Sequence, residues 1–225
     1  MVEAFEIISG VYCVGGSQLS APEDASVYLL GDADELWLLD SGCGPSLPAI
    51  LQNVAQLGFD PQNIRKVIAT HCHIDHSGGL AELKARVNLE VIAHRGDVDA
   101  LEGKAPQKVA AEFYGLTYHP VQVDTVLEQP REIFYLGPQK ITLQHVPGHT
   151  PGSIIAWGDF LQGRLLFGQD LHGPLHPNWG SDEKAWRNSL RQLLALKADI
   201  LAEGHFGVIS PAEEVERFIQ GFLFA

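Results

Sequence analysis

Four side chains of the kinds that bind metals lie within six residues of the stretch Thr70-His71-Cys72-His73-Ile74-Asp75-His76. It follows directly on residues 64–69, a short apolar segment that is typical of a buried strand. Imidazole and carboxylate groups are good ligands for zinc and iron, and four such groups packed this closely are costly to bury without a metal. The stretch therefore predicts a metal site on a loop at the end of a strand. On such a loop, His71 and His73 can point to one metal, and Asp75 and His76 to a second.

Further ligand candidates recur at the ends of later predicted strands. His149 follows the predicted strand 140–145, Asp170 follows 165–167, and His205 follows 200–202. Strand ends that are far apart in sequence can converge on one edge of a pair of sheets. We therefore expect these three side chains to join the groups of residues 71–76.

The remaining pattern indicates an α/β (α+β) fold. Strands come in two batches, each followed by helices, and two mixed β-sheets packed face to face with helices on both outer faces would bury all the apolar faces. This is a four-layer αββα sandwich, expected to form one domain over residues 1–225. Strands are predicted at 5–14, 27–30, 36–39, 64–69, 91–93, 132–136, 140–145, 153–157, 165–167 and 200–202, and helices at 48–57, 79–86, 183–196 and 211–222. Residues 95–119 are less regular, and we expect a helix with a loop that covers the site.

Five landmarks occur in an order that resembles the metallo-β-lactamase superfamily, and more narrowly its glyoxalase II-like branch. The landmarks are Asp40-Ser41-Gly42, residues 71–76, Gly148-His149-Thr150, Gly168-Gln169-Asp170 and Gly204-His205. The resemblance covers nearly the whole chain and implies the metallo-β-lactamase fold.

The resemblance also implies a role for each ligand candidate. His71, His73 and His149 would bind a first metal; Asp75, His76 and His205 would bind a second; Asp170 would bridge both. The cofactor would be two divalent metal ions, with zinc preferred and iron or manganese as alternatives. Asp40 would lie behind the ligands and orient one of them, although a turn residue that ends a strand is an equal alternative.

Such a site supports hydrolysis. Two metals can share a water and lower its pKa, and the resulting hydroxide attacks a carbonyl or phosphoryl centre. Asp75 is expected to act as a ligand and also to orient the hydroxide or relay its proton. We therefore expect a metal-dependent hydrolase that cleaves a thioester, a lactone or another ester, or a phosphoester. A serine hydrolase is disfavoured because the Gly-x-Ser-x-Gly motif is absent.

The choice among substrates is narrowed by two features. The bridging Asp170 and the lack of a signal sequence disfavour a β-lactamase. Only 20 residues follow His205, so the helical extension with which full-length glyoxalase II binds glutathione is expected to be missing. Two alternatives remain open. One is a persulfide dioxygenase with a single iron on His71, His149 and Asp170, and the other is a non-catalytic metal-binding protein.

Net charge, the first residues and the cysteines limit which binding partners and which cellular compartment we expect. The formal net charge of −13 disfavours binding to a nucleic-acid backbone. The first residues have no basic region and no long apolar stretch, so neither a signal peptide nor a membrane span is predicted. Cys13, Cys43 and Cys72 fit free thiols in a reducing cytoplasm. We expect a cytoplasmic enzyme with a small-molecule substrate and no membrane partner, and a homodimer as an option.

Several residues near the ligands are candidates for a substrate pocket. His172 and His176 follow Asp170, Trp179 could form an apolar wall, and Tyr114 or Tyr118 could offer a phenol that stabilises an oxyanion. Surface exposure or ordinary packing is the alternative for each of them. The Cys72 side chain is expected to turn away from His71 and His73, as a buried structural thiol with no set chemical role.

Overall fold

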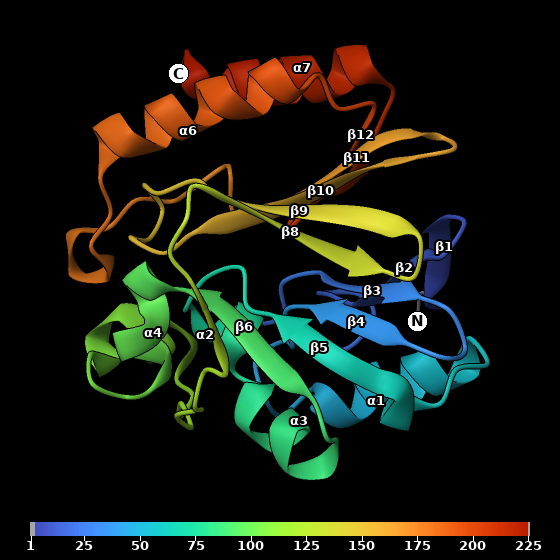
Figure 1. The fold of residues 1–225 in the computed structure, drawn as a ribbon. Helices are drawn as coiled ribbons and strands as arrows, with labels where there is room; N and C mark the ends of the chain where they lie inside the picture. Colours follow the sequence, from blue (N-terminus) through green and yellow to red (C-terminus); the bar gives the residue numbers. More distant parts are fainter. Residues whose placement is uncertain (1–2, 225) are drawn as a thin grey trace.

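Two sheets that pack face to face, with helices outside both, form the core of the molecule (Figure 1). The computed structural model describes residues 3–224, and thirteen strands occur within this range. The predicted four-layer αββα sandwich is confirmed. In Figure 1, α1 and α3 lie below the two sheets, and α6 and α7 lie above them.

The first sheet has seven strands in the order β1-β2-β3-β4-β5-β6-β7. Neighbours from β1 to β4 are antiparallel, and neighbours from β4 to β7 are parallel, so the sheet is mixed. Its strands are β1 (Phe5–Ile8), β2 (Val11–Gly15), β3 (Val27–Gly31), β4 (Leu36–Leu39), β5 (Ile64–Ile68), β6 (Glu90–His94) and β7 (Thr125–Leu127).

The second sheet has six strands in the order β13-β12-β11-β10-β9-β8. It is also mixed, because β11 and β12 are parallel whereas the other neighbours are antiparallel. Its strands are β8 (Arg131–Leu136), β9 (Gln139–His145), β10 (Ile154–Phe160), β11 (Gly163–Gln169), β12 (Ile200–Glu203) and β13 (Gly207–Ile209).

The longer helices cover the outer faces through apolar stripes at helical spacing. Leu47, Ile50 and Val54 of α1 are buried in a cluster with the first sheet. The stripe of α7 is buried with α6 against the second sheet. These helices are α1 (Leu47–Gln56), α3 (Leu80–Arg86), α6 (Glu183–Leu196) and α7 (Ala212–Leu223). The shorter ones are α2 (Ile74–Ser77), α4 (Arg95–Leu101) and α5 (Ala111–Tyr114), and single 3-10 turns lie at Pro61–Asn63, Pro106–Val109 and Pro177–Trp179.

Strands β3 and β4 of the first sheet are apolar on both faces because both faces are buried. In β3, Leu29 belongs to the apolar cluster between the first sheet and its covering helices. Tyr28 and Leu30 belong to the cluster between the two sheets. Across the strand pair, Tyr28 faces Leu39 and Leu30 faces Trp37, and all four side chains are almost wholly buried. This layer between the sheets fixes their separation, and with it the distance between ligand loops carried by different sheets.

The main difference from the predicted elements lies at the start of the chain. Residues 5–14 were expected to form one strand, but they form β1 and β2, a hairpin that turns at Gly10. Gly10 has φ +78, a conformation that glycine adopts without the steric cost of a Cβ. The short strands β7 and β13 were not predicted, because segments of three residues carry too little periodicity.

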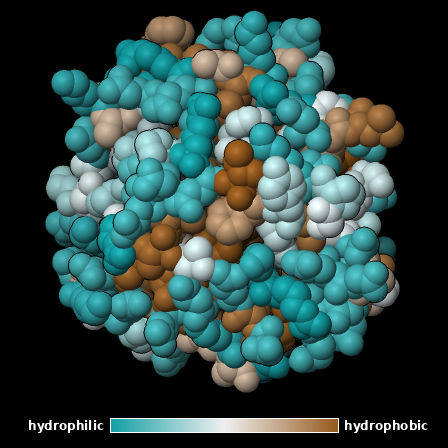
Figure 2. All heavy atoms as spheres, viewed as in Figure 1, coloured by the Kyte–Doolittle hydropathy of each residue, from teal (hydrophilic) through white to brown (hydrophobic). Residues whose placement is uncertain are grey.

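The face of the molecule drawn in Figure 2 is mainly hydrophilic, which is consistent with the net charge of −13. Figure 2 shows that the apolar side chains exposed on this face form scattered patches among hydrophilic ones. Within residues 3–224, no helix combines the length and hydropathy that crossing a membrane requires.

Candidate metal centre

The predicted ligands lie where strands end at a common edge of the two sheets. Strands β4 and β5 are parallel, as are β11 and β12, so within each pair the carboxyl ends face the same way. Residues 71–76 follow β5, and Asp170 directly follows β11. His149 follows β9 and His205 follows β12, so four separate loops supply the cluster. Asp75 and His76 lie on α2, a single helical turn rather than the expected loop.

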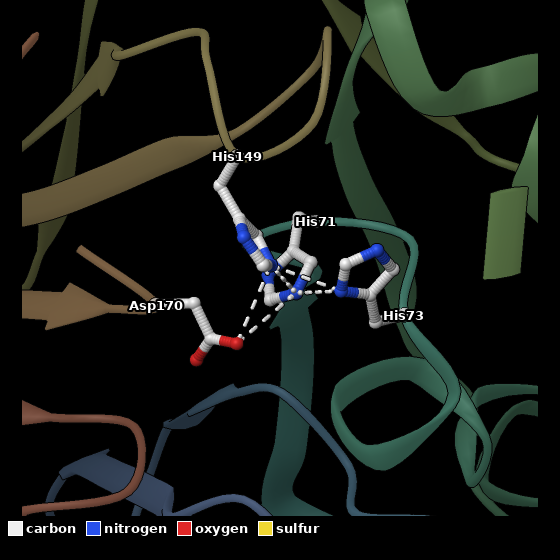
Figure 3. A group of neighbouring side chains, drawn as sticks. All are labelled: His71, His73, His149 and Asp170. Carbon is white, nitrogen blue, oxygen red and sulfur yellow. Dashed lines mark hydrogen bonds and ion pairs between the residues drawn. The ribbon is translucent and has the colours of Figure 1, made fainter. Parts of the chain in front are cut away.

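The first group consists of His71, His73, His149 and Asp170 (Figure 3). Nε2 of His149 lies 3.2 Å from Nε2 of His71 and 2.9 Å from Nδ1 of His73. Oδ2 of Asp170 lies 3.4 Å from Nε2 of His149 and 3.8 Å from Nε2 of His71. Three ring nitrogens and one carboxylate oxygen thus converge on one point.

The second group consists of Asp75, His76, Asp170 and His205. Here the other oxygen of Asp170, Oδ1, lies 3.0 Å from Nε2 of His76 and 3.2 Å from Nε2 of His205. Oδ2 of Asp75 lies 3.4 Å from Nε2 of His205 and 3.6 Å from Nε2 of His76. In each group the four ligand atoms lie within 4.8 Å of one another.

The side chains present fit metal ions. Nitrogen and carboxylate donors in sets of four are typical of zinc and of mixed His/Asp sites for iron or manganese. Among the described residues, Nε2 of His76 and Oδ1 of Asp170 are buried and lie 3.0 Å apart, but neither atom makes a hydrogen bond of good geometry. Buried polar atoms are normally satisfied, so both atoms point to a group that protein atoms do not supply.

Protonation in the first group also suits a metal. Burial, reinforced by the neighbouring imidazoles, holds the pKa of His71 well below its ordinary value. Burial lowers the pKa of His73 to about 3. Both rings are therefore neutral near neutral pH, which is the form that binds a metal.

In the second group, by contrast, the pKa shifts of Asp170 and His205 favour the charged forms of both side chains. Burial opposes ionisation of Asp170, but the charge of His76 and hydrogen bonds from surrounding histidines hold the pKa of this carboxyl well below its ordinary value. Burial likewise opposes the charged form of His205, yet Asp170 and Asp75 raise its pKa to about 10. The two carboxylates thus favour a cation at this position, and a metal ion would take the place of the protons.

Asp40 lies behind the second group and holds His76. Oδ2 of Asp40 accepts a hydrogen bond from Nδ1 of His76 at 2.6 Å, and it also contacts the amide nitrogen of Gln169. Thr70 donates to the same carboxylate through its backbone N–H and its hydroxyl, each at 2.8 Å. The contact turns Nε2 of His76 towards the other ligand candidates, an arrangement in which Asp40 could orient His76 for a metal.

Asp97, on α4, was not singled out from the sequence, although it ties two ligand loops together. Its wholly buried carboxylate accepts from the backbone N–H of Cys72 at 3.0 Å, between His71 and His73. It also accepts from the hydroxyl of Thr150 at 2.6 Å and the N–H of Gly152 at 2.8 Å, directly after His149. One side chain thereby fixes the spacing between both halves of the first group.

The loop that carries His149 also packs tightly against α6. A Cβ at Gly148 would lie 2.3 Å from backbone atoms of Trp186, and φ at this position is +140. Only glycine fits both conditions, which explains the Gly148-His149 landmark. Trp186 itself lies on α6 and donates from Nε1 to the carbonyl of Leu171.

A cavity of about 230 Å³ opens beside both groups, and it is here called the metal-facing pocket. Of the candidate pocket residues, His172, Trp179 and Tyr114 line it. Burial, with the neighbouring Asp75, raises the pKa of Tyr114, so its hydroxyl keeps its proton. The residues that line the pocket are His73, Asp75, Ala110, Phe113, Tyr114, His149, Asp170, His172, Pro174, Trp179 and His205.

Two candidates lie outside this pocket. The ring of His176 packs at a tilt against Trp179, with ring centroids 5.1 Å apart, and its Nδ1 accepts from the N–H of Asn178. Tyr118 is a correction to the sequence prediction, since its hydroxyl donates to the carbonyl of Leu101 and its ring packs on the apolar cluster beneath the first sheet. Cys72 is buried and its thiol donates to the carbonyl of Lys108. Burial raises the pKa of this thiol, so it stays protonated as a structural group.

Glu203 and Phe113 were also missed by the sequence analysis. Glu203 is wholly buried, and its Oε1 lies 2.7 Å from Nδ1 of His172. Its Oε2 accepts from the N–H of His205 at 2.7 Å, so one carboxylate positions a ligand loop and a pocket histidine. Glu203 directly precedes Gly204-His205, which is the only sequence signal that could have identified it. Phe113 lies in the segment predicted to cover the site, and no periodicity marked it.

Comparison with known proteins agrees with this architecture. The sequence model of the Metallo-beta-lactamase superfamily matches residues 21–205. The chain is 31% identical over 188 residues to a hydroxyacylglutathione hydrolase from Methylococcus capsulatus, covering 81% of this chain and 62% of that protein. It is 28% identical over 165 residues to the acyl-coenzyme A thioesterase MBLAC2 from Bos taurus, covering 64% and 58%. Among solved structures, a metallo-beta-lactamase variant from Cronobacter sakazakii superposes with a TM-score of 0.77 at 29% identity, covering 91% of this chain and 81% of that one.

The chain therefore belongs to the metallo-β-lactamase superfamily, a superfamily of metal-dependent hydrolases. It spans about three fifths of the length of the hydroxyacylglutathione hydrolase and of the thioesterase. The relatives act on small molecules, and their names describe different substrates on one shared fold, so the substrate has to be argued from the pocket of this chain.

Proposed function

We propose that this chain is a dinuclear metal hydrolase that cleaves an ester-type bond in a small molecule. The observation that carries the proposal is the position of Asp170, because its two carboxylate oxygens face different ligand groups. Oδ2 faces His71 and His149, and Oδ1 faces His76 and His205. A carboxylate shared in this way supports a bridge between two cations, for which zinc is our first choice and iron or manganese the alternatives.

Two bound divalent cations would lower the pKa of a water molecule and polarise the scissile carbonyl or phosphoryl group. In the hydrolysis, the oxygen of water adds to the acyl or phosphoryl centre, the bond to the leaving oxygen or sulfur breaks, and the leaving group gains a proton. The residues of this chain would position these partners. Asp75, which lines the pocket and faces His205, would orient the water and accept its proton, and the hydroxyl of Tyr114 would donate to the developing oxyanion.

A thioester, a lactone or another carboxylic ester, or a phosphoester all fit this chemistry. The relatives named as a hydroxyacylglutathione hydrolase and an acyl-coenzyme A thioesterase support the thioester. The single-iron persulfide dioxygenase would use only His71, His149 and Asp170 as ligands, and the number of bound metal ions together with oxygen uptake separates it from the hydrolase. The complete ligand set argues against a non-catalytic metal-binding protein.

The test combines elemental analysis of the protein purified without added metal with assays on thioester, lactone, phosphodiester and β-lactam substrates. We expect about two metal ions per chain and turnover of at least one ester-type substrate, lost on chelation and restored by zinc. One iron per chain with oxygen consumption on glutathione persulfide would overturn the proposal in favour of the dioxygenase. Tight metal binding with no turnover of any substrate would overturn it in favour of a binding protein.

A further inference from the structure

Two segments that are far apart in sequence form an apolar wall over the first ligand group. Trp179 lies with its ring centroid 4.5 Å from that of His73 and 6.0 Å from that of His149. The ring of Phe113, on α5, packs edge-on against Trp179 at 5.3 Å. Ala110 and Pro174 complete the apolar part of the pocket lining. These four residues, Ala110, Phe113, Pro174 and Trp179, are here called the apolar wall.

Phe113 contributes little to the packing of the fold, because most of the residue is exposed. Two thirds of the residue is exposed (67%), whereas Trp179 is only 7% exposed. The ring is carried on a single helical turn between two left-handed residues, Ala110 and Gly115. An exposed phenyl ring at the mouth of a pocket gains free energy only when something apolar covers it.

The charges of the pocket lining limit which chemical groups of a substrate can pack against the apolar wall. The described residues that line it include four histidines and the two carboxylates Asp75 and Asp170, but no lysine and no arginine. A carboxylate or phosphate on the part of a substrate that lies here would therefore find no fixed cation other than the metals, and burying it unpaired is costly. The apolar wall thus suits an uncharged group.

The pocket lining beside the second ligand group is polar and includes Asp75, His172 and His205. His172 lies beside His205, with ring centroids 5.2 Å apart. Its Nδ1 is held by Glu203, and Nε2 has no protein partner within residues 3–224. The leaving oxygen or sulfur of an ester-type substrate is polar and gains charge as the bond breaks, so it suits this side. With the leaving group on this side, the acyl group lies against the apolar wall.

We propose that the site selects substrates with an uncharged, apolar acyl group, which packs against Phe113 and Trp179 while the leaving group faces His172. This inference rests on the proposed function, since it names the substrate class of the same site. Phe113 is then a specificity-determining residue, and short or carboxylated acyl groups are poor substrates.

The experiment uses the metal-loaded enzyme and three p-nitrophenyl esters that share one leaving group: the acetate, the hexanoate and the hemisuccinate. We expect kcat/KM for the hexanoate to exceed that for each of the other two esters by about tenfold, as methylene discrimination in an apolar pocket allows. Phe113→Ser should lower the hexanoate-to-acetate ratio by about threefold or more. Phe113→Leu, which keeps an apolar side chain, should restore most of it.

Tyr135→Ser is the matched control, because Tyr135 is an equally exposed aromatic residue (65%) on β8, away from the pocket. It should keep the wild-type ratio. A ratio that is the same in Phe113→Ser as in the wild type, or a preference for the hemisuccinate, would overturn the inference while leaving the hydrolase in place.

A binding measurement separates the inference from the proposed function. Hexanamide and acetamide are titrated and followed by tryptophan fluorescence, with Trp179→Phe to assign the signal. We expect tighter binding of hexanamide, weakened by Phe113→Ser, in metal-free and metal-loaded protein alike. Should no ester be turned over, this result would still support the apolar site while the hydrolase proposal fails. Equal binding of the two amides would overturn the apolar site itself.

Discussion

Oδ2 of Asp40 lies 2.6 Å from Nδ1 of His76, and both side chains are completely buried. Nδ1 of His76 donates a hydrogen bond to this carboxylate, so the other ring nitrogen, Nε2, faces Asp75 and Asp170 and is the one placed to bind a metal. At His149 the corresponding nitrogen, Nδ1, has a neutral partner instead, the carbonyl oxygen of Pro174 at 2.8 Å. A charged partner at His76 and a neutral one at His149 should therefore make His76 the more basic ligand.

Asp40→Asn tests this relationship. The amide keeps the shape of the side chain but removes the charge that supports His76, so we expect metal affinity or activity to fall by about 10- to 100-fold. Affinity is measured by competition with a chelator, and activity on the best substrate of the panel. Asp34→Asn, at an exposed position between β3 and β4, should have no effect. Unchanged metal affinity in Asp40→Asn would show that Asp40 only ends its strand.

Metal stoichiometry tests the bridge. Asp170→Ala removes a ligand atom from both groups, so we expect turnover to be lost and metal content to fall well below two ions per chain. His205→Ala removes a ligand from the second group alone and should keep about one ion. Both values come from elemental analysis after dialysis against a weak chelator. Full activity in Asp170→Ala, or the same loss in the two variants, would contradict the bridging role.

The clustering of the candidate ligands could be predicted from the sequence because their signals are local. His71, His73, Asp75 and His76 are clustered in the chain, and His149, Asp170 and His205 each follow a predicted strand. The layers could be predicted because the apolar periodicity of each segment reports which faces are buried. Each signal is contained in a short stretch.

The supporting residues could not be found in this way. Asp97 reaches Cys72 and Thr150 only because α4 packs between their loops, and a single aspartate in a helix carries no sign of this. Phe113 and Tyr118 lie in one irregular segment, where no period indicates which aromatic ring faces the pocket. Only the three-dimensional path of residues 95–119 separates the two, and it places Phe113 at the pocket and Tyr118 in the core.

Asp97→Ala should destabilise the fold. Three buried donors, on Cys72, Thr150 and Gly152, would lose their acceptor, and an unsatisfied buried polar group costs about 1–3 kcal/mol. We expect the free energy of unfolding to fall by about 3 kcal/mol or more, measured by urea denaturation. Asp99→Ala, two residues further along α4 and largely exposed, should change it by less than about 0.5 kcal/mol. Equal stability of the two variants would show that Asp97 does not hold the loops.

A pair of stacked histidines joins the two sheets. His94, at the end of β6, stacks on His145, at the end of β9, with ring centroids 3.6 Å apart and an angle of 14° between the planes. Burial, then the nearby His145 and Arg95, lower the pKa of His94 from 6.5 to about 4, against the opposing effect of Glu128. Nδ1 of His94 also accepts a hydrogen bond from the N–H of Gly96, at the start of α4.

The sign of the pH dependence follows from this depressed pKa. Between pH 6.5 and about 4, the unfolded chain binds a proton at His94 that the folded chain does not bind. The stabilisation is therefore complete above pH 6.5 and is lost as the pH falls towards 4. In metal-free protein, Tm should drop more between pH 7 and 4.5 in the wild type than in His94→Asn, which keeps an acceptor for the N–H of Gly96. His119→Asn, at an exposed position, should behave as the wild type does, and the same drop in all three proteins would mean that His94 titrates normally in the fold.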